Sequence, residues 1–229
     1  MARRVPSQER GRRTQESVVE GAAAVFEFKG YEAASLGEIA EASHVSQGTM
    51  YFHFKSKEQI ALAVLQEQHD RMYKDVDEAV KRTPDPLGQI IYISHTASRL
   101  LIEDVVVRAG INLAMGQGAL RDASARSYVA WTEALAPRIL RAQEAAIVHS
   151  RLPAERIARS LVSSFTGIQL MSQAITNRAD LMPRMADMWQ IMVDSVVVSA
   201  LRNTYQQLAE GVFTEPLQPT TSIAVEKED

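Results

Sequence analysis

Three serines divide residues 30–60 into short helical units, and their spacing limits the folds that this chain can adopt. Ser35 is followed three residues later by a glutamate, and Ser56 by a glutamine, which is the spacing of a capping box. Ser46 is suited to cap another helix, from residue 47 to about residue 53. The stretch "ASHV" before it is long enough only for a turn. The sequence therefore predicts two short helices joined by a tight turn.

Longer helices are predicted on either side of these units. In residues 14–30 the apolar side chains recur at helical spacing, and Gly30 then supplies a stop. Residues 57–82 form a long helical pattern that ends at "TPDP". Residues 14–55 thus hold three helices, the last two joined by a turn. This is the helix-turn-helix arrangement, in which the later helix enters the major groove of DNA.

The rest of the chain continues the helical pattern. Beyond residue 86, five segments keep helical spacing and none alternates with a period of two over a useful length. We expect an all-α fold, with a three-helix domain over residues 14–56 and a larger helical domain over residues 57–210. Residues 211–229 contain two prolines, polar residues and charge, and are predicted to be a disordered tail.

Charge and motif content exclude several classes of protein. The net charge is −3, but residues 1–13 carry five arginines against one glutamate, a basic arm that is either a solvated end or a nucleic-acid contact. There are no cysteines, and the five histidines lack the spacing of metal ligands. No HExxH, GxSxG or phosphate-binding glycine loop occurs. We expect no metal, no cofactor and no catalysis.

Hydropathy gives no sign of a membrane or secreted protein. No apolar run approaches the ~18 residues that a membrane-spanning helix needs. The N-terminus carries charge but lacks the apolar segment of a signal peptide. We therefore expect a cytoplasmic protein that makes no contact with a membrane.

The segment "VSQGTMYFHFKSKEQ" combines core residues with residues suited to DNA. Val45, Met50 and Phe54 can face inward, whereas the others are too polar for a buried face. A glycine allows close backbone approach, tyrosine and histidine can donate to phosphate, phenylalanine can pack on a sugar, and lysine can pair with the backbone. Glutamine and threonine are suited to read adenine and thymine edges. The predicted DNA contacts are Gln47, Gly48, Thr49, Tyr51, Phe52, His53 and Lys57.

Residues 14–65, with "GYEAASLGEIAEASHVSQGTMYFHFKSKEQIALAVL", resemble the DNA-binding domain of the TetR family of transcriptional repressors. This resemblance implies a homodimer with two helix-turn-helix domains, a helical ligand-binding and dimerisation domain, and a pseudo-palindromic double-stranded operator. It adds Ser35 to the residues that would face DNA. Many members carry Lys or Arg where this chain has Gln47, so the base preference does not transfer.

The segments "VVVRAGINLAM", "YVAWTEAL" and "SFTGIQLMSQAI" are similar to γ-butyrolactone receptors of antibiotic-producing filamentous bacteria. That resemblance places Trp131 in the wall of a ligand pocket, although a tryptophan in a helix is by default a core residue. Polar side chains in apolar surroundings need partners, which a lactone, a backbone carbonyl or water could supply. The candidates are Gln68, Ser164, Thr166 and Gln169. Pro137 should kink or break its helix near this pocket.

The last two long helices are apolar over more than one face, which indicates burial on several sides. A dimer interface would bury the extra face, and a two-fold dimer would place two recognition helices about one DNA turn, or a multiple of it, apart. The residues that suggest this are Met185, Met188, Trp189, Met192, Val193, Val196, Val197 and Leu201.

The sequence thus predicts a ligand-responsive repressor that a small apolar effector, a lactone or butenolide, releases from its operator to control antibiotic production. One alternative is a TetR-type regulator of an unrelated apolar ligand such as an antibiotic. Another is a non-specific architectural DNA-binding protein, which would show steep salt dependence and little sequence preference. A third is a small-molecule binding or enzymatic bundle with a vestigial DNA-binding head.

Overall fold

A computed structural model describes residues 7–115 and 120–214, and within them the chain is built from helices. An isolated β-bridge joins Val148 to Val197. The all-α prediction is confirmed. The helices are α1 (Ser7–Ala33), α2 (Leu36–Ala42), α3 (Gln47–His53), α4 (Lys57–Val80), α5 (Pro86–Glu103), α6 (Val105–Ala114), α7 (Arg121–Glu144), α8 (Ala154–Thr176), α9 (Leu181–Val196), η2 (Ser199–Leu201) and α10 (Arg202–Thr214).

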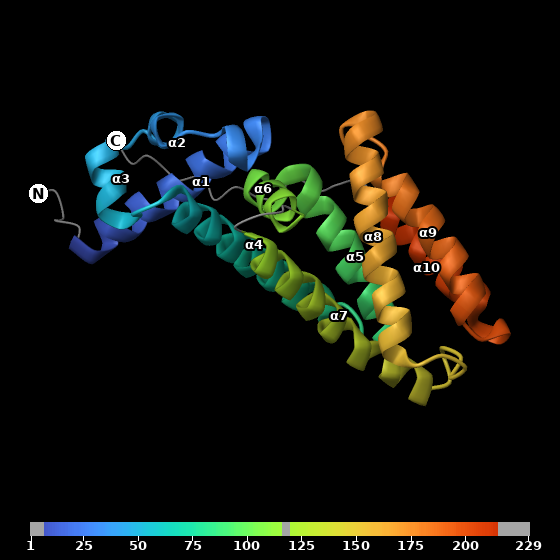
Figure 1. Cartoon of the computed structure of the whole chain (residues 1–229). Helices are drawn as coiled ribbons and strands as arrows, with labels where there is room; N and C mark the ends of the chain where they lie inside the picture. The colour runs from blue at the N-terminus through green and yellow to red at the C-terminus, as the bar shows by residue number, and fades with distance from the viewer. Residues whose placement is uncertain (1–6, 116–119, 215–229) are drawn as a thin grey trace, which may run out of the picture.

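Figure 1 shows an elongated molecule with a small head and a larger body. Helices α1, α2 and α3 form the head at one end. Helix α4 runs from the head along the body, where α5, α7, α8, α9 and α10 gather, and α6 lies between the two parts. The long helix after the helix-turn-helix is therefore shared by both ends of the molecule.

The predicted helix caps are present. Ser35 and Glu38 make both bonds of a capping box at the start of α2. The Ser46 hydroxyl accepts from the amide of Thr49 at the start of α3. The Ser56 hydroxyl likewise caps α4, but its glutamine partner turns one residue further back, to the amide of Lys55. Local side-chain chemistry thus sets these three helix starts.

The N-terminal arm differs from the prediction. Residues 7–13 belong to α1, where Arg12 pairs with Glu9 and Glu16, and Arg13 pairs with Glu9. Arm residues 1–6 lie outside the described residues. The helical pattern ends as expected, since Gly30 has a φ of 78° and interrupts α1.

One further expectation is wrong, and of the kink or break expected at Pro137 only the break is excluded. Residues 211–214 are helical, because α10 continues to Thr214 and buries Val212 and Phe213 in the body, while residues 215–229 lie outside the described part. Helix α7 continues through Pro137 without a break. A proline within a helix removes a single backbone bond, and here the packing of Ile139 and Ala142 in the core maintains the helix on its far side.

Two hydrophobic clusters hold the molecule together, and α6 belongs to both. The head cluster includes Phe26, Ile39, Met50 and Val64 from α1 to α4, and the body cluster is built from α5 and α7 to α10. On α6, Val106, Ala109 and Leu113 face the head cluster, whereas Val107 and Ile111 face the body cluster. The cores therefore do not follow the predicted division at residue 56, and the domain boundaries stay a prediction.

The apolar faces of α9 are explained differently from the prediction. Met185, Trp189, Val193 and Val197 are buried in the body cluster of the same chain, because α5, α8 and α10 enclose α9. Met192, Val196 and Leu201 are partly buried against the same cluster, and Met188 is buried in it. The large apolar side chains that remain exposed on α8 and α9 are Leu170, Met171, Ile175 and Ile191.

Candidate functional site

The recognition helix α3 is fixed to the head from one side. Met50 is fully buried and Phe54 nearly so, and Val45 in the preceding turn packs against the same cluster. This is the inward face that the sequence predicted. Since these residues anchor both ends of a seven-residue helix, its opposite face is held in place for contact.

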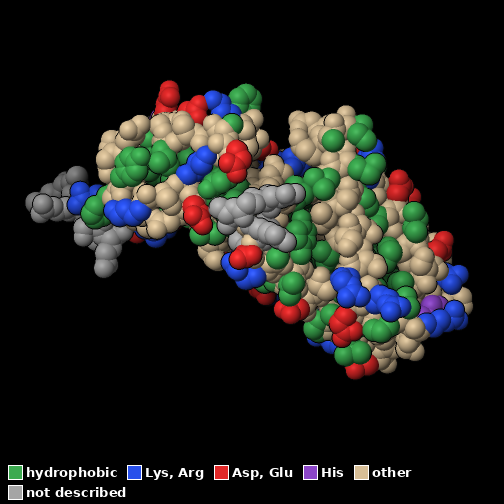
Figure 2. Space-filling view, in the orientation of Figure 1, with side chains coloured by type: hydrophobic (Ala, Val, Ile, Leu, Met, Phe, Trp, Pro, Cys, Tyr) green, Lys and Arg blue, Asp and Glu red, His purple; other side chains and the backbone are tan. Residues whose placement is uncertain are grey.

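That opposite face carries most of the predicted DNA-contact residues. Gln47, Gly48 and Thr49 are exposed, as are Tyr51 at 44% and Phe52 at 76%. His53 is half-buried, with its ring edge-on to Phe52. Figure 2 shows hydrophobic side chains gathered on the end of the molecule formed by α2 and α3, with lysines and arginines beside them. Exposed aromatic rings beside cations are suited to the sugars and phosphates of DNA.

Short-range bonds order this face before any DNA binds. The hydroxyl of Thr49 lies 2.8 Å from that of Ser46. The ammonium of Lys55 donates to the carbonyls of Tyr51 and Phe52 and so satisfies the C-terminal end of α3. A side chain added at Gly48 would meet nothing within 4 Å, which leaves room for a nucleic-acid backbone.

Two predicted DNA contacts have structural roles in the free chain. The ammonium of Lys57 donates to the carbonyls of Tyr31, Glu32 and Ala34, at 2.8, 3.0 and 2.9 Å, and lies over the Tyr31 ring. All three of its donors are thereby occupied, so a phosphate contact would need one of these bonds to break. The hydroxyl of Ser35 is exposed but engaged by the capping box. Both DNA contacts remain predictions.

Helix α1 packs very closely against the turn of the helix-turn-helix. A Cβ atom added at Gly21 of α1 would lie 2.4 Å from Ser43 Oγ and 2.6 Å from its backbone nitrogen. His44, the next residue of the turn, has a φ of 54°, a region that non-glycine residues seldom adopt. The glycine therefore allows α1 to lie directly against the turn that orients α3.

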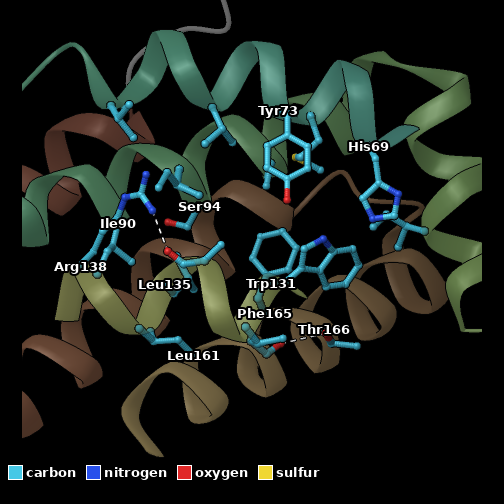
Figure 3. A pocket seen from close by; sticks show the side chains of 18 of the residues that line it. His69, Tyr73, Ile90, Ser94, Trp131, Leu135, Arg138, Leu161, Phe165 and Thr166 are labelled. Carbon is cyan, nitrogen blue, oxygen red and sulfur yellow. Dashed lines mark hydrogen bonds between the residues drawn. The ribbon is translucent and has the colours of Figure 1, made fainter. Parts of the chain in front are cut away.

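A cavity of about 280 Å³ lies in the body, enclosed mainly by α4, α5, α7 and α8 (Figure 3). Its walls are mostly apolar, with Ile111 of α6 and Met188 and Trp189 of α9 completing them. On α4 the lining runs from His69 to Val80, a length of about 16 Å at 1.5 Å per residue. This size and lining suit a small, elongated, largely apolar molecule.

Two of the five predicted ligand residues line this cavity. Trp131 is in its wall, with Tyr128 edge-on to its ring at a centroid distance of 5.2 Å, and Figure 3 shows the indole facing the opening beneath Tyr73. Thr166 also lines it, but its hydroxyl donates to the carbonyl of Val162. To a ligand in the cavity, Trp131 thus offers mainly apolar ring surface, and Thr166 offers mainly its methyl group.

The other three predicted ligand residues are not in the cavity wall. Gln68 is fully buried against α6, where a Cβ added at Gly110 would lie 2.4 Å from Gln68 Cβ, and neither atom of its amide has a partner among the described residues. Gln169 is buried with its amide nitrogen on the sulfur of Met115. Ser164 is half-buried outside the lining. A ligand role for these three has no geometric support.

Sequence reasoning missed several cavity residues that carry polar atoms. Arg138 lies two turns after Trp131 on the same face of α7, and His69, Tyr73 and Asp77 line the cavity from α4. The seven-residue spacing of Trp131 and Arg138 was a usable signal, since residues two turns apart share a helix face. Sequence alone could not show that α4 covers that face.

The described ranges hold neither a metal-binding cluster nor a membrane-spanning helix. Residues 7–115 and 120–214 contain no group of three or more histidine, aspartate or glutamate side chains placed to hold a metal ion. No helix in these ranges has the length and apolar content needed to cross a bilayer.

A recognition helix on a fixed head and a hollow apolar body define the class: a helix-turn-helix regulator with a small-molecule pocket. Residues 18–64 match the family described as bacterial regulatory proteins of the tetR family, and residues 85–198 match the tetracyclin repressor-like C-terminal domain. The chain belongs to the TetR family, as its motifs indicated.

The similar proteins include one named as a receptor, one solved with its operator DNA and one described in connection with bacterial hormones. The A-factor receptor protein of Streptomyces griseus is 33% identical over 189 residues, which cover 82% of this chain and 66% of that protein's length. CprB from Streptomyces coelicolor, solved with its operator sequence, is 26% identical with a TM-score of 0.79, covering 90% of this chain and all of that one. A structure described as the molecular basis for control of antibiotic production by bacterial hormones is 30% identical with a TM-score of 0.72, covering 81% and 98%.

Proposed function

We propose that this protein is a homodimeric transcriptional repressor that a small lactone or butenolide releases from a pseudo-palindromic operator, in the control of antibiotic production. The protein would act in the cytoplasm and would catalyse no reaction. Support comes from TetR-family membership, from relatives described as an A-factor receptor and as an operator-binding protein, and from the apolar cavity.

The single observation that carries this proposal is that one helix belongs to both sites. Helix α4 starts at Lys57, which is bonded to the end of α1 in the head, and three turns further on it forms one wall of the cavity. A ligand that moves this wall would therefore move the point at which the head is attached. A connection of this kind is what a ligand-controlled DNA-binding protein needs.

Ion pairs around α6 strengthen the connection. The guanidinium of Arg71 on α4 bonds Asp104 at the start of α6, at 3.0 and 3.1 Å, and reaches Glu20 of α1 at 3.3 Å. Arg108 on α6 pairs with Glu27 of α1. Both arginines tie α1 to the helices that adjoin the cavity, so the head and the cavity wall are expected to move together.

The mechanism follows from differential binding. The free dimer binds two half-sites through its α3 helices, with Gln47 and Thr49 at base edges and Tyr51, Phe52 and His53 on the backbone. The effector must prefer the arrangement of heads that does not fit the operator. A 100-fold loss of DNA affinity requires ~2.7 kcal/mol of coupling between the two sites.

The test is fluorescence anisotropy of the purified protein on the DNA flanking its own gene, titrated with a set of γ-butyrolactones and butenolides. Sequence-specific binding that one compound releases is the expected result. Specific binding that none releases would keep the repressor and point to another effector, such as an antibiotic. Binding without sequence preference, with a steep dependence on salt, would overturn the proposal in favour of an architectural protein.

A further inference from the structure

One carboxylate of the head lies between two arginines from other parts of the molecule. Glu27 on α1 is bonded through Oε1 to the guanidinium of Arg108 on α6. The same oxygen lies 3.9 Å from Nη1 of Arg178, in the turn between α8 and α9. A separation of 3.9 Å is too long for a hydrogen bond. Glu27 is therefore bonded to one of the two guanidiniums and is only near the other.

Arg178 is a buried cation with unsatisfied donors. Its side chain is 5% exposed, and its Nε and Nη2 are closed off from solvent and have no hydrogen-bond partner among residues 7–115 and 120–214. Burial lowers the pKa of Arg178, although Glu27 opposes this, and a guanidinium stays protonated in a protein. A buried cation without a bonded counter-charge is costly. A closer approach of Glu27 would therefore relieve a cost that the described arrangement carries.

The backbone of this turn is held in an unusual conformation. Asn177 and Arg178 have φ angles of 51° and 67°, a region that asparagine tolerates and arginine seldom adopts. Such conformations persist only where the surrounding structure holds them, and they are frequent in switch regions. The amide of Arg178 donates to the carbonyl of Ser172 on α8 at 3.1 Å. This bond ties the turn to α8, so the guanidinium is expected to follow any movement of that helix.

Helix α8 connects this turn to the cavity. Its cavity-lining residues are Leu161, Val162, Phe165 and Thr166. From Thr166 the helix runs about 15 Å to its end at Thr176, directly before the turn. Figure 1 shows this end of α8 on the side of the body that faces the head. An occupant that displaces α8 would therefore move Arg178 relative to Glu27, by a route that is separate from α4.

We propose that Glu27 exchanges Arg108 for Arg178 when the head moves, so that Arg178 positions the DNA-binding head in one of two orientations. The inference rests on the proposed function and deepens it, because it names a second connection between the cavity and the head. Closing the gap from 3.9 Å to a hydrogen bond requires a movement of roughly 1 Å. Since α1 carries Glu27 and packs directly on the turn before α3, this movement reaches the recognition helix.

The experiment measures the distance between the two heads of the dimer. The chain contains no cysteine, so Ala42→Cys at the exposed end of α2 gives one spin label per protomer. Pulsed EPR then reports the head-to-head distance without DNA or effector. Arg108→Met in this labelled protein removes the partner that Glu27 has in the described arrangement. Glu27 is then expected to bond Arg178, and the distance is expected to shift by about 2 Å, from a movement of roughly 1 Å in each head.

A second substitution separates the exchange of partners from a purely structural role of Arg108. In Arg108→Met/Arg178→Met the new partner is missing as well, so the distance is expected to return to that of the labelled parent. Arg178→Met alone should leave the distance unchanged, because Arg108 still holds the carboxylate. Arg184→Met is the matched control, since Arg184 pairs with Asp180 and not with α1. It should leave the distance unchanged in both backgrounds, with and without Arg108→Met.

Operator affinity is expected to follow the distance. Arg108→Met should change it by roughly tenfold, which is the effect of losing one charged hydrogen bond, and the double variant should restore it. Fluorescence anisotropy on the DNA flanking the gene measures both. If Arg108→Met does not fold, Arg108→Gln takes its place, because glutamine lacks the charge but keeps a donor for the carbonyl of Ile102.

Two results would overturn the inference. One is an unchanged head-to-head distance in Arg108→Met, and the other is a shift that persists in the double variant, which would show that the head moves without Arg178. Neither result would touch the proposed repressor function. Failure of the wild-type protein to bind its flanking DNA specifically would instead overturn the repressor proposal, and the distances would still decide whether Glu27 changes partner.

Discussion

The two hydrophobic cores of this molecule differ in how completely they are filled. In the head cluster, α1 approaches the turn of the helix-turn-helix so closely that Gly21 has no room for a Cβ atom. The body cluster is larger, yet it encloses a cavity of about 280 Å³. Close packing resists deformation, whereas a void lowers the cost of rearrangement. The head is therefore built to hold the geometry of α3, and the body is built to respond to an occupant.

The head and the body also differ in how completely their polar groups are hydrogen-bonded. In the head, the hydroxyls of Ser35 and Ser46 and the ammonium groups of Lys55 and Lys57 are all bonded to neighbouring chain. Hydrogen bonds from Lys29 and then Ser35 hold the pKa of Glu38 at about 2, so its carboxylate stays ionised in the capping box. In the body, Arg138 and Gln68 keep buried donors without acceptors. The head thus satisfies these groups within the chain, whereas the described part of the body leaves the Gln68 amide and the Nε of Arg138 without hydrogen-bond partners.

Gly21→Ala is expected to cause the largest loss of stability, because it disturbs the close packing of the head. The added methyl group would lie 2.6 Å from a backbone nitrogen, which cannot rotate away, and we expect a loss of about 3 kcal/mol in the free energy of unfolding. Urea denaturation measures it. Gly167→Ala on α8 is the matched control, because nothing lies within 4 Å there and replacing a helical glycine should gain up to ~1 kcal/mol. Equal stability of the two variants would show that the head is as adaptable as the body.

Trp131→Ala should enlarge the cavity and leave the head unchanged. Because the indole is a large part of the apolar wall, we expect effector affinity to fall at least tenfold, or by about 1.4 kcal/mol, with operator binding intact. Anisotropy on operator DNA with and without the effector separates the two quantities. Unchanged release would place the effector elsewhere.

Gln68→Met tests whether the unpaired amide buried beside α6 lowers the stability of the protein. Methionine keeps the unbranched shape that fits against Gly110 and removes an amide with no partner in the described structure, so stability should rise by about 1.5 kcal/mol. Thermal denaturation without ligand measures this. A fall in stability would mean that the amide has a partner, and loss of effector response would give Gln68 the ligand role that its sequence position suggested.

Tyr51→Ala should have the smallest effect, because the head would lose one exposed contact and no packing. We expect about 1 kcal/mol weaker binding, by similar amounts on operator and non-operator DNA, since phosphate contacts carry no sequence information. Anisotropy on both DNAs checks it. Undiminished binding would remove Tyr51 from the interface, and a loss confined to the operator would make it a base reader.

Sequence predicted the head better than the body, for a physical reason. The helix starts at Ser35, Ser46 and Ser56 depend on residues three positions away, and the inward placement of Met50 depends on helix periodicity. These are local properties that can be read without knowing the fold. The head therefore could be drawn almost completely from its residues, apart from the bonds that occupy Lys57.

The body depended on contacts between distant segments. Arg138 lines a cavity only because α4 and α5 close over α7. The sequence predicted a ligand contact for Gln68, but this side chain packs on α6. The chain leaves α9 at Val197, makes an isolated bridge with Val148 and then turns into η2. No local pattern specifies which of several apolar helices will leave a cavity between them.

The sharing of α6 between the two cores has a consequence for how the molecule melts. A chain with two separate cores would unfold in two steps, but neither core here is complete without the ten residues of α6. Loss of either core strips α6 of part of its packing, so a single calorimetric transition is expected, with equal calorimetric and van't Hoff enthalpies. A compound bound in the body should then raise the melting temperature of the recognition helix as well. The same few side chains would make the DNA-binding end thermally dependent on a pocket it never touches.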